Sequence, residues 1–190
     1  MMARRVVVVG ASCAGKSTFA RALAAAHGSD CIDLDDLFWA PGWQPRPRED
    51  FLDDVRARTR QDDWVVAGNY AVARAVIWPR ATGIVWLDLS LPHILWRWGT
   101  RTWRRASRGE VLAHGNRETF GRTFFSRDSL LWWILKTYGP RRKEFTALRH
   151  APEFAHLTWF VARSPREADT LLRRLQVTDA AGAPIEERQP

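Results

Sequence analysis

Cysteine, tyrosine and methionine are scarce in this sequence, with two of each among 190 residues. The two cysteines, Cys13 and Cys31, provide no disulfide framework, which indicates a reducing compartment, and we expect the cytoplasm. No stretch approaches about 18 consecutive apolar residues, so we expect no membrane-spanning helix. The first apolar run begins within a few residues of the first methionine, which argues against a signal peptide.

Acidic residues are fewer than basic ones, 21 against 29, and the formal net charge is +8. The excess lies in one segment. Between Trp96 and Arg149 there are thirteen Lys and Arg residues and four acids, whereas the rest of the chain is close to neutral. A charge this concentrated predicts a polyanionic ligand for that segment.

The hydrophobic content of 46% is high enough for a globular core. The length fits a single domain, which we place at residues 1–177. Residues 178–190 contain Ala, Gly, Pro and charged residues, and we expect them to form a flexible tail.

The most informative stretch is G-A-S-C-A-G-K-S, residues 10–17, which directly follows four valines. The pattern GxxxxGK[ST] between a strand and a helix is typical of a phosphate-binding loop. Its backbone N–H groups and the positive end of the helix would face the phosphates of ATP, while Lys16 reaches the β- and γ-phosphates and Ser17 binds Mg²⁺. The expected nucleotide contacts are Gly10, Ala11, Ser12, Cys13, Ala14, Gly15, Lys16, Ser17 and Thr18.

Strand and helix patterns alternate along the chain. Strands are predicted at 5–9, 31–34, 64–67, 84–89 and 157–161, and helices at 16–27, 48–61, 90–106, 117–138 and 165–175. Gly139 and Pro140 should end the fourth helix, and residues 38–47 should form a turn-rich segment. This order predicts an α/β fold of the P-loop NTPase type, with a five-stranded parallel sheet, helices on both faces and ligands at the carboxyl ends of the strands.

Polar side chains follow the predicted strands. They are Asp33 and Asp35 after the second strand, Asn69, Tyr70 and Arg74 after the third, Asp88 after the fourth, and Arg163 and Ser164 after the fifth. Since the carboxyl ends of parallel strands share one edge of the sheet, we expect these side chains to surround the phosphate-binding loop.

The motifs G-A-S-C-A-G-K-S-T, L-D-D-L-F-W-A-P-G-W, W-V-V-A-G-N-Y and V-W-L-D-L-S occur in this order. Together they resemble the adenylate-kinase-like P-loop kinases, and more narrowly the FlaR-like branch, whose members are often labelled DNA topology modulation proteins. The resemblance implies a small phosphotransferase with an acceptor-binding insertion after the second strand and an Arg-rich lid, which we place at about residues 97–125.

Several residue roles follow from this resemblance. Arg101 and Arg105 are expected to contact phosphate or adenine, and Arg74 to hold an acceptor phosphate. Arg163 is expected to contact the nucleotide because it follows the fifth strand. The chain departs from the family at Ala67, where an acid usually helps to hold the Mg²⁺ water shell. Asp33 and Asp35 resemble the D-x-D pair of shikimate-kinase-like enzymes and could supply the missing carboxylate. Otherwise the protein turns over slowly, or binds nucleotide without reaction.

The spacing of arginines and apolar residues also predicts the lid helix. Five arginines fall within roughly a 100° arc of a helix that starts near Ser90, beside an apolar sector that would pack on the sheet. They are Arg97, Arg101, Arg104, Arg105 and Arg108. An anion that neutralises them would explain why five like charges share one face.

The acceptor site is less determined. Asp35 could accept a proton from an acceptor hydroxyl or could cap a short helix. Trp39 and Trp43 could stack on a ring of the acceptor, whereas Trp64, Trp86 and Trp159 lie in strand patterns and should be core residues. The adjacent Trp132 and Trp133 cannot both face inward on a helix.

Two functions are compatible with these patterns. The first is an ATP-dependent phosphotransferase whose acceptor is a nucleoside, a nucleotide or another small hydroxyl compound. The second is a nucleotide-dependent protein whose basic segment binds nucleic acid, with tryptophans stacking on single strands. We favour the first, because the charge gathers where a lid is expected.

Overall fold

The computed structural model describes residues 5–108 and 130–181, without the side chains of 105–108 and 178–181. Five parallel strands form the main sheet in the order β2-β5-β1-β6-β7. They are β1 (Arg5–Gly10), β2 (Asp30–Asp33), β5 (Trp64–Ala67), β6 (Gly83–Leu87) and β7 (Thr158–Ala162). This is the predicted sheet, and each strand lies within two residues of its expected position.

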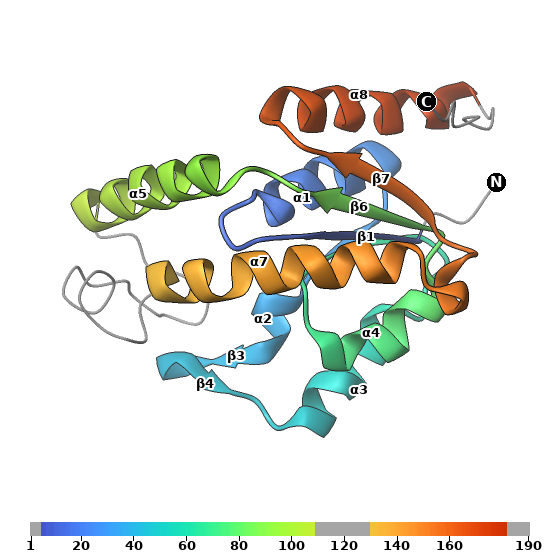
Figure 1. Cartoon of the computed structure of the whole chain (residues 1–190). Helices are drawn as coiled ribbons and strands as arrows, with labels where there is room; N and C mark the ends of the chain where they lie inside the picture. Colours follow the sequence, from blue (N-terminus) through green and yellow to red (C-terminus); the bar gives the residue numbers. More distant parts are fainter. Residues whose placement is uncertain (1–4, 109–129, 182–190) are drawn as a thin grey trace.

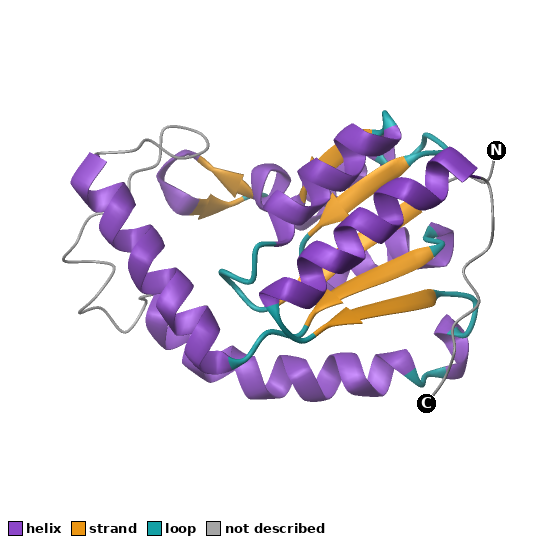
Figure 2. Cartoon of the chain, turned by 90° about the horizontal axis from the view of Figure 1, so that it is seen from above, coloured by secondary structure: helices purple, strands orange, loops and turns teal. Residues whose placement is uncertain are grey.

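Helices cover both faces of the sheet, as predicted (Figures 1 and 2). On one face lie α1 (Lys16–His27) and α8 (Pro165–Ala181), which contact each other. On the other lie α3 (Arg48–Arg58), α4 (Ala71–Ile77) and α7 (Leu130–Arg149). The helix α5 (Leu91–Arg108) projects beyond the carboxyl ends of the strands. That edge of the sheet is therefore flanked by α5 and α7, and it carries the phosphate-binding loop.

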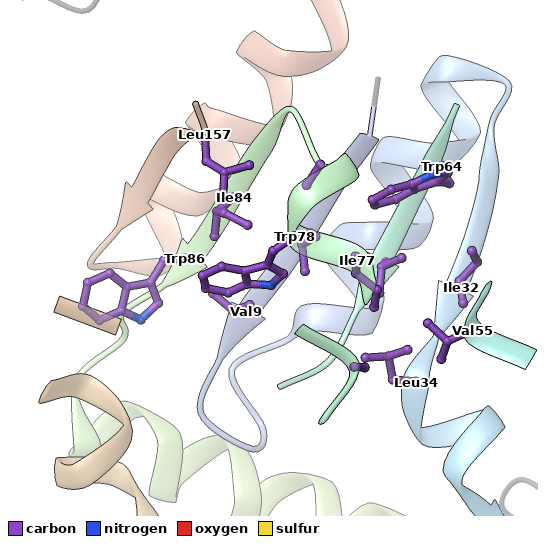
Figure 3. Packing of buried hydrophobic residues seen from close by; sticks show 14 of the residues in the cluster. Val9, Ile32, Leu34, Val55, Trp64, Ile77, Trp78, Ile84, Trp86 and Leu157 are labelled. Carbon is purple, nitrogen blue, oxygen red and sulfur yellow. The ribbon is translucent and has the colours of Figure 1, made fainter. Parts of the chain in front are cut away.

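The valine run of β1 explains the two-sided core. Val7 and Val9 face the cluster that includes α3 and α4, whereas Val6 and Val8 face α1. A strand covered on both faces needs apolar residues at successive positions rather than in alternation. Figure 3 shows the first of these clusters, built on Trp64, Trp78 and Trp86. Burial of the three strand tryptophans is confirmed, with Trp64, Trp86 and Trp159 all at most 6% exposed.

The prediction that Gly139 and Pro140 end a helix is wrong, because α7 runs from Leu130 to Arg149 with Pro140 inside it. Proline removes one backbone hydrogen bond and disfavours the helix interior. Here tertiary packing outweighs that cost, since Ile134 before the proline and Phe145 after it are buried in different core clusters. The predicted helix at 117–138 lies partly outside the described residues.

The turn-rich segment contains more regular structure than predicted. A short helix α2 (Leu34–Phe38) leads into an antiparallel pair, β3 (Trp39–Ala40) and β4 (Gln44–Pro45), around the 3₁₀ helix η1 (Pro41–Trp43). The helix α4 and the 3₁₀ helices η2 (Trp78–Arg80) and η4 (Pro152–Phe154) were not predicted. At the other end of the chain, α8 extends four residues into the segment expected to be a tail, and 182–190 lie outside the described residues.

None of the helices in the described part of the chain is both long enough and apolar enough to cross a membrane.

Candidate active site

The loop between β1 and α1 has the backbone that phosphate binding requires. Gly10 and Gly15 have φ of 147° and 98°, and a Cβ atom at Gly10 would lie 2.7 Å from the carbonyl oxygen of Leu87. Both positions therefore need glycine. Within the turn, the N–H of Ala14 donates to the carbonyl of Ala11 at 3.1 Å. The helix α1 then starts at Lys16, so its positive end adjoins the loop.

A side chain from a neighbouring strand holds the first glycine of this loop. Asn69, just past β5, accepts a hydrogen bond from the N–H of Gly10 at 3.1 Å and donates to the carbonyl of the same residue. The strand-end pattern placed Asn69 near the phosphate-binding loop. The structure adds its partner, Gly10, which no local pattern could reveal because 59 residues separate the two.

Lys16 is tied to its own loop, since its Nζ donates to the carbonyl of Ala11 at 3.1 Å. Burial lowers the pKa of Lys16, and the negative charge of Asp35 opposes this shift. A half-buried ammonium with one hydrogen-bond partner among the described residues favours an incoming anion, because charge is costly to remove from water without a counter-charge. A phosphate would be such an anion.

The predicted magnesium ligands Ser17 and Asp33 are next to each other. The Ser17 hydroxyl donates a hydrogen bond to the Asp33 carboxylate, while burial raises the pKa of that carboxyl group. Asp33 is also in register with Ala67 on the adjacent strand β5. The carboxylate thus lies beside Ala67, the position where the resemblance led us to expect an acid. Oxygen donors of this kind suit Mg²⁺, so these residues fit the ion. No group of three or more His, Cys, Asp or Glu side chains in the described ranges forms a protein-only metal site.

Asp35 does not cap a helix. Asp33 is the residue before α2, and its Oδ1 accepts from the N–H of Asp35 at 3.2 Å. This leaves the side chain of Asp35 for another partner, and its Oδ1 accepts a hydrogen bond from the hydroxyl of Tyr70 at 2.6 Å. Asp35 is exposed at the carboxyl edge of the sheet and close enough to Lys16 for their charges to interact.

On α5 the structure brings Arg97 against the phosphate-binding loop. A Cβ atom added to Gly15 would lie 3.0 Å from Nη2 of Arg97, so the guanidinium covers this glycine. Arg101 is half-buried on the same helix, and the side chain of Arg105 lies outside the described part of the structure. The predicted apolar sector is confirmed, because Ile94 and Trp98 are buried. Arg97, the first of the five arginines on this face of α5, therefore lies against the phosphate-binding loop.

The side chain of Arg74 interacts with two other side chains of the protein. Its Nη2 lies 2.6 Å from Oε1 of Glu144 on α7, and its guanidinium lies 4.9 Å from the ring centroid of Trp78. Arg74 also lines a small pocket together with Asn69, Tyr70 and Phe145. The residue expected to hold an acceptor phosphate is therefore at the predicted edge of the sheet, but its side chain pairs with a carboxylate.

Two arginines of α7 were missed as site residues. Arg142 pairs with the buried Asp88 beyond β6, with Nε 2.9 Å from Oδ1. Arg141 lines a pocket with Ala11 of the phosphate-binding loop and Asp88. Burial lowers the pKa of Arg141, and the nearby Glu144 is the strongest of the groups that raise it.

Among the described residues Arg141 has no hydrogen-bond partner, although its guanidinium lies over the Trp133 ring, 5.7 Å from the ring centroid. Its charge also interacts with those of Asp35 and Lys16. The sequence signal was the basic run at 141–143, but nothing local indicated which member would face the site.

Arg163, past β7, is exposed. Its backbone N–H donates to Oε2 of Glu167 at 2.9 Å, and the Ser164 hydroxyl donates to Oε1 of the same residue. The N–H of Glu167 donates back to Ser164, so these residues cap the start of α8. The structural role at this strand end thus belongs to Ser164 and Glu167.

Comparison with known proteins gives a likeness of fold. No protein-family model matches the chain, and no curated protein matches it. A sugar kinase from a Janibacter species has a TM-score of 0.52 and 21% identity, covering 94% of this chain and 95% of its own. A gluconokinase from Sinorhizobium meliloti has a TM-score of 0.50 and 22% identity, covering 96% and 98%. A shikimate kinase from Acinetobacter baumannii, solved with shikimate, has a TM-score of 0.51 and 18% identity, covering 93% of each chain.

These similarities confirm the predicted fold class. The chain has the α/β fold of the P-loop kinases, with a five-stranded parallel sheet between helices. The narrower FlaR-like resemblance stays a prediction.

Proposed function

We propose that the protein is an ATP-dependent phosphotransferase that acts on a small hydroxyl compound. The observation that carries this proposal is the convergence of three elements at one edge of the sheet. They are the phosphate-binding loop with Lys16, the hydrogen-bonded pair of Ser17 and Asp33, and the exposed carboxylate of Asp35. A nucleotide-binding protein without turnover would have no use for the third element.

Each residue would have a distinct task. The backbone of residues 10–18 and Lys16 bind the phosphates, while Ser17 and Asp33 hold Mg²⁺, which supplies charge neutralisation during transfer. Asp33 takes over the part of the acid missing at Ala67, because the two positions are adjacent in register. Asp35 orients the acceptor hydroxyl and receives its proton. Its alternative role is that of a second carboxylate beside the Mg²⁺ ion.

Arginines would stabilise the charge that develops on the transferred group. Arg97 lies against Gly15 and is our first candidate, with Arg101 and Arg105 further along the same helix. Planar guanidinium groups can meet two oxygens of a phosphoryl group at once. Arg163 remains a proposed contact to the nucleotide at the edge formed by β7.

The acceptor would carry a negative charge as well as a hydroxyl group. Arg141 has a partly buried guanidinium whose donors are not used by other described residues, and Arg74 lies near it across Glu144. An anionic group of the acceptor would complete the hydrogen bonding of Arg141 and compete with Glu144 for Arg74. Phosphorylated nucleosides and sugar acids both meet this description, and the structural neighbours named above include a gluconokinase.

The test is transfer of labelled phosphate from Mg²⁺ and ATP to a panel of nucleosides, nucleoside monophosphates, sugars and hydroxy acids. We expect one anionic acceptor to be phosphorylated, and Lys16→Met to reduce the rate at least about a hundredfold, as loss of a transition-state contact does. Arg97→Ala should weaken ATP binding more than Arg104→Ala, the matched change two turns further along the same face of α5, where the side chain is exposed. If ATP binds but no panel member is phosphorylated, the protein has kept the nucleotide site without the reaction, and the proposal fails.

One observation favours the alternative function, nucleotide-dependent nucleic-acid binding. Trp96, Trp103, Trp132 and Trp133, all in the basic segment, are 48–69% exposed. Exposed aromatic rings among basic residues suit stacking on single strands. Binding of a single-stranded oligonucleotide that falls steeply between about 50 and 200 mM salt would support this function. Absence of binding at low salt would exclude it.

A further inference from the structure

Tyr70 joins two sequence motifs that lie far apart along the chain. Its hydroxyl donates to Oδ1 of Asp35 at 2.6 Å and accepts a hydrogen bond from the side chain of Trp39. Asp35 and Trp39 belong to the L-D-D-L-F-W motif, and Tyr70 belongs to A-G-N-Y. These two hydrogen bonds, from Trp39 to Tyr70 and from Tyr70 to Asp35, therefore connect β3 with the loop after β5 and that loop with α2.

The direction of the Tyr70 hydroxyl is set by its two partners. The indole of Trp39 can only donate, so it occupies a lone pair on the phenol oxygen, and the single proton of Tyr70 is directed at Asp35. Burial raises the pKa of Tyr70, and the charge of Asp35 raises it further. A phenol is protonated at neutral pH, so the Tyr70 hydroxyl is the donor in this bond.

The Tyr70 ring is held in place by packing. It lies 4.6 Å from the Phe38 ring centroid and 5.4 Å from that of Phe51, which is fully buried. The preceding residue, Asn69, is bonded to Gly10. The hydroxyl thus has a defined position relative to the phosphate-binding loop, although Asp35 itself is exposed.

Asp35 needs such support because of the charges around it. Lys16 and Arg141 both attract its carboxylate, and Asp33 repels it. If Asp35 paired with Lys16, neither group would be available for its partner in phosphoryl transfer. A neutral donor can hold the carboxylate without neutralising it, and the bond from Tyr70 uses Oδ1 and leaves Oδ2 for an acceptor hydroxyl.

We propose that Tyr70 is a positioning residue for Asp35, and that Trp39 directs the Tyr70 hydroxyl toward it. This inference rests on the proposed phosphotransferase function. Trp39, which the sequence suggested as a stacking surface for the acceptor, acts here through its ring N–H.

The kinetic test uses the best acceptor of the panel with saturating Mg²⁺ and ATP. Tyr70→Phe removes one oxygen and keeps the ring, so we expect kcat to fall by about ten- to a hundredfold, as loss of one hydrogen bond to a charged group does. The KM for ATP should change less than about twofold. Thr137→Val is the control, because it deletes an exposed hydroxyl that donates to the carbonyl of Trp133 within α7 at 2.7 Å. Its kcat should stay within about twofold of the wild-type value.

A double-mutant cycle tests the part of Trp39. Trp39→Phe should lower kcat less than Tyr70→Phe, and it should have no further effect when Tyr70 is already phenylalanine. Additive losses would show that Trp39 acts by another route and would overturn that half of the proposal. A Tyr70→Phe enzyme with wild-type kcat, or one in which the KM for ATP rises in parallel, would overturn the positioning role.

The hydrogen bond itself can be observed without turnover. In a Tyr138→Phe background, proton NMR should show one downfield hydroxyl resonance, which is lost in Tyr70→Phe and in Asp35→Asn. If the resonance is present and the wild type phosphorylates an acceptor, but Tyr70→Phe is fully active, only the positioning role fails. If the wild type phosphorylates no acceptor, the proposed function and this inference fail together.

Discussion

Replacement of Asn69 by alanine should destabilise the whole domain. Asn69 makes two hydrogen bonds to the backbone of Gly10, one as acceptor at 3.1 Å and one as donor. Alanine removes both and leaves an N–H and a carbonyl of the phosphate-binding loop without partners. A net loss of about 1 kcal/mol for each bond, with the cost of the unpaired groups, gives about 2–5 kcal/mol.

This loss converts to a measurable change in thermal unfolding. A domain of 150–250 residues loses about 2–4 °C in Tm per kcal/mol, so Asn69→Ala should melt about 4–20 °C below the wild type. The rise in Tm that saturating Mg²⁺ and ATP cause should also be smaller in the variant, since Gly10 begins the loop that binds the phosphates. Circular dichroism or scanning fluorimetry, with and without nucleotide, measures both.

Thr137→Ala is the matched control for this experiment. It also removes a hydrogen bond from a side chain to a backbone carbonyl, that of Trp133 at 2.7 Å, but this bond lies within α7 and is exposed. We expect its Tm to stay within about 2 °C of the wild type, as for most exposed substitutions. If Asn69→Ala melted as high as Thr137→Ala, the bonds to Gly10 would not support the loop and the reasoning would be wrong.

Three further predictions concern glycine and cysteine. A Cβ atom at Gly68, where φ is 147°, would lie 2.7 Å from Cβ of Leu34, so Gly68→Ala should lower Tm strongly. Gly42→Ala should lower Tm far less, because φ is 74° there but nothing lies within 4 Å of the added Cβ atom. Equal losses of Tm in the two variants would contradict this prediction. Burial raises the pKa of the Cys31 thiol, so its thiolate fraction at pH 8 is small, and its alkylation rate, followed by mass spectrometry, should keep rising through pH 9 and above. Mg²⁺ and ATP should slow alkylation of Cys13 in the phosphate-binding loop but leave Cys31 unaffected, and equal protection of both would count against the proposed nucleotide site.

Much of the site could be predicted because its residues lie close together in the sequence or follow strands. Ser17 and Asp33 were both assigned to the metal, and the structure joins them by a hydrogen bond. The position of Asp35 was predicted, but its partner Tyr70 was not, since 35 residues separate them. The strand-end rule places a residue at the edge of the sheet, but it does not say which neighbours its side chain will meet.

The helices at the edge of the site were predicted less well. The spacing of Arg97 and Arg101 places both side chains on one face of α5, but only the packing of that helix brings Arg97 to Gly15. The continuation of α7 through Pro140 contradicted a sound local rule. Because α7 continues past Pro140, Arg141 lies on that helix and lines the pocket beside Ala11.

The sequence by itself determined the phosphate-binding loop, the alternation of strands and helices, and the polar residues at the strand ends. These features depend on backbone conformation and on hydrophobic patterns over a few residues, which are properties of the local chain. Only the tertiary structure decided that Asn69 holds Gly10, that Tyr70 holds Asp35, and that Arg141 faces the loop. Each of these contacts joins residues from different strands and helices, and their free energy is gained only when those elements pack together.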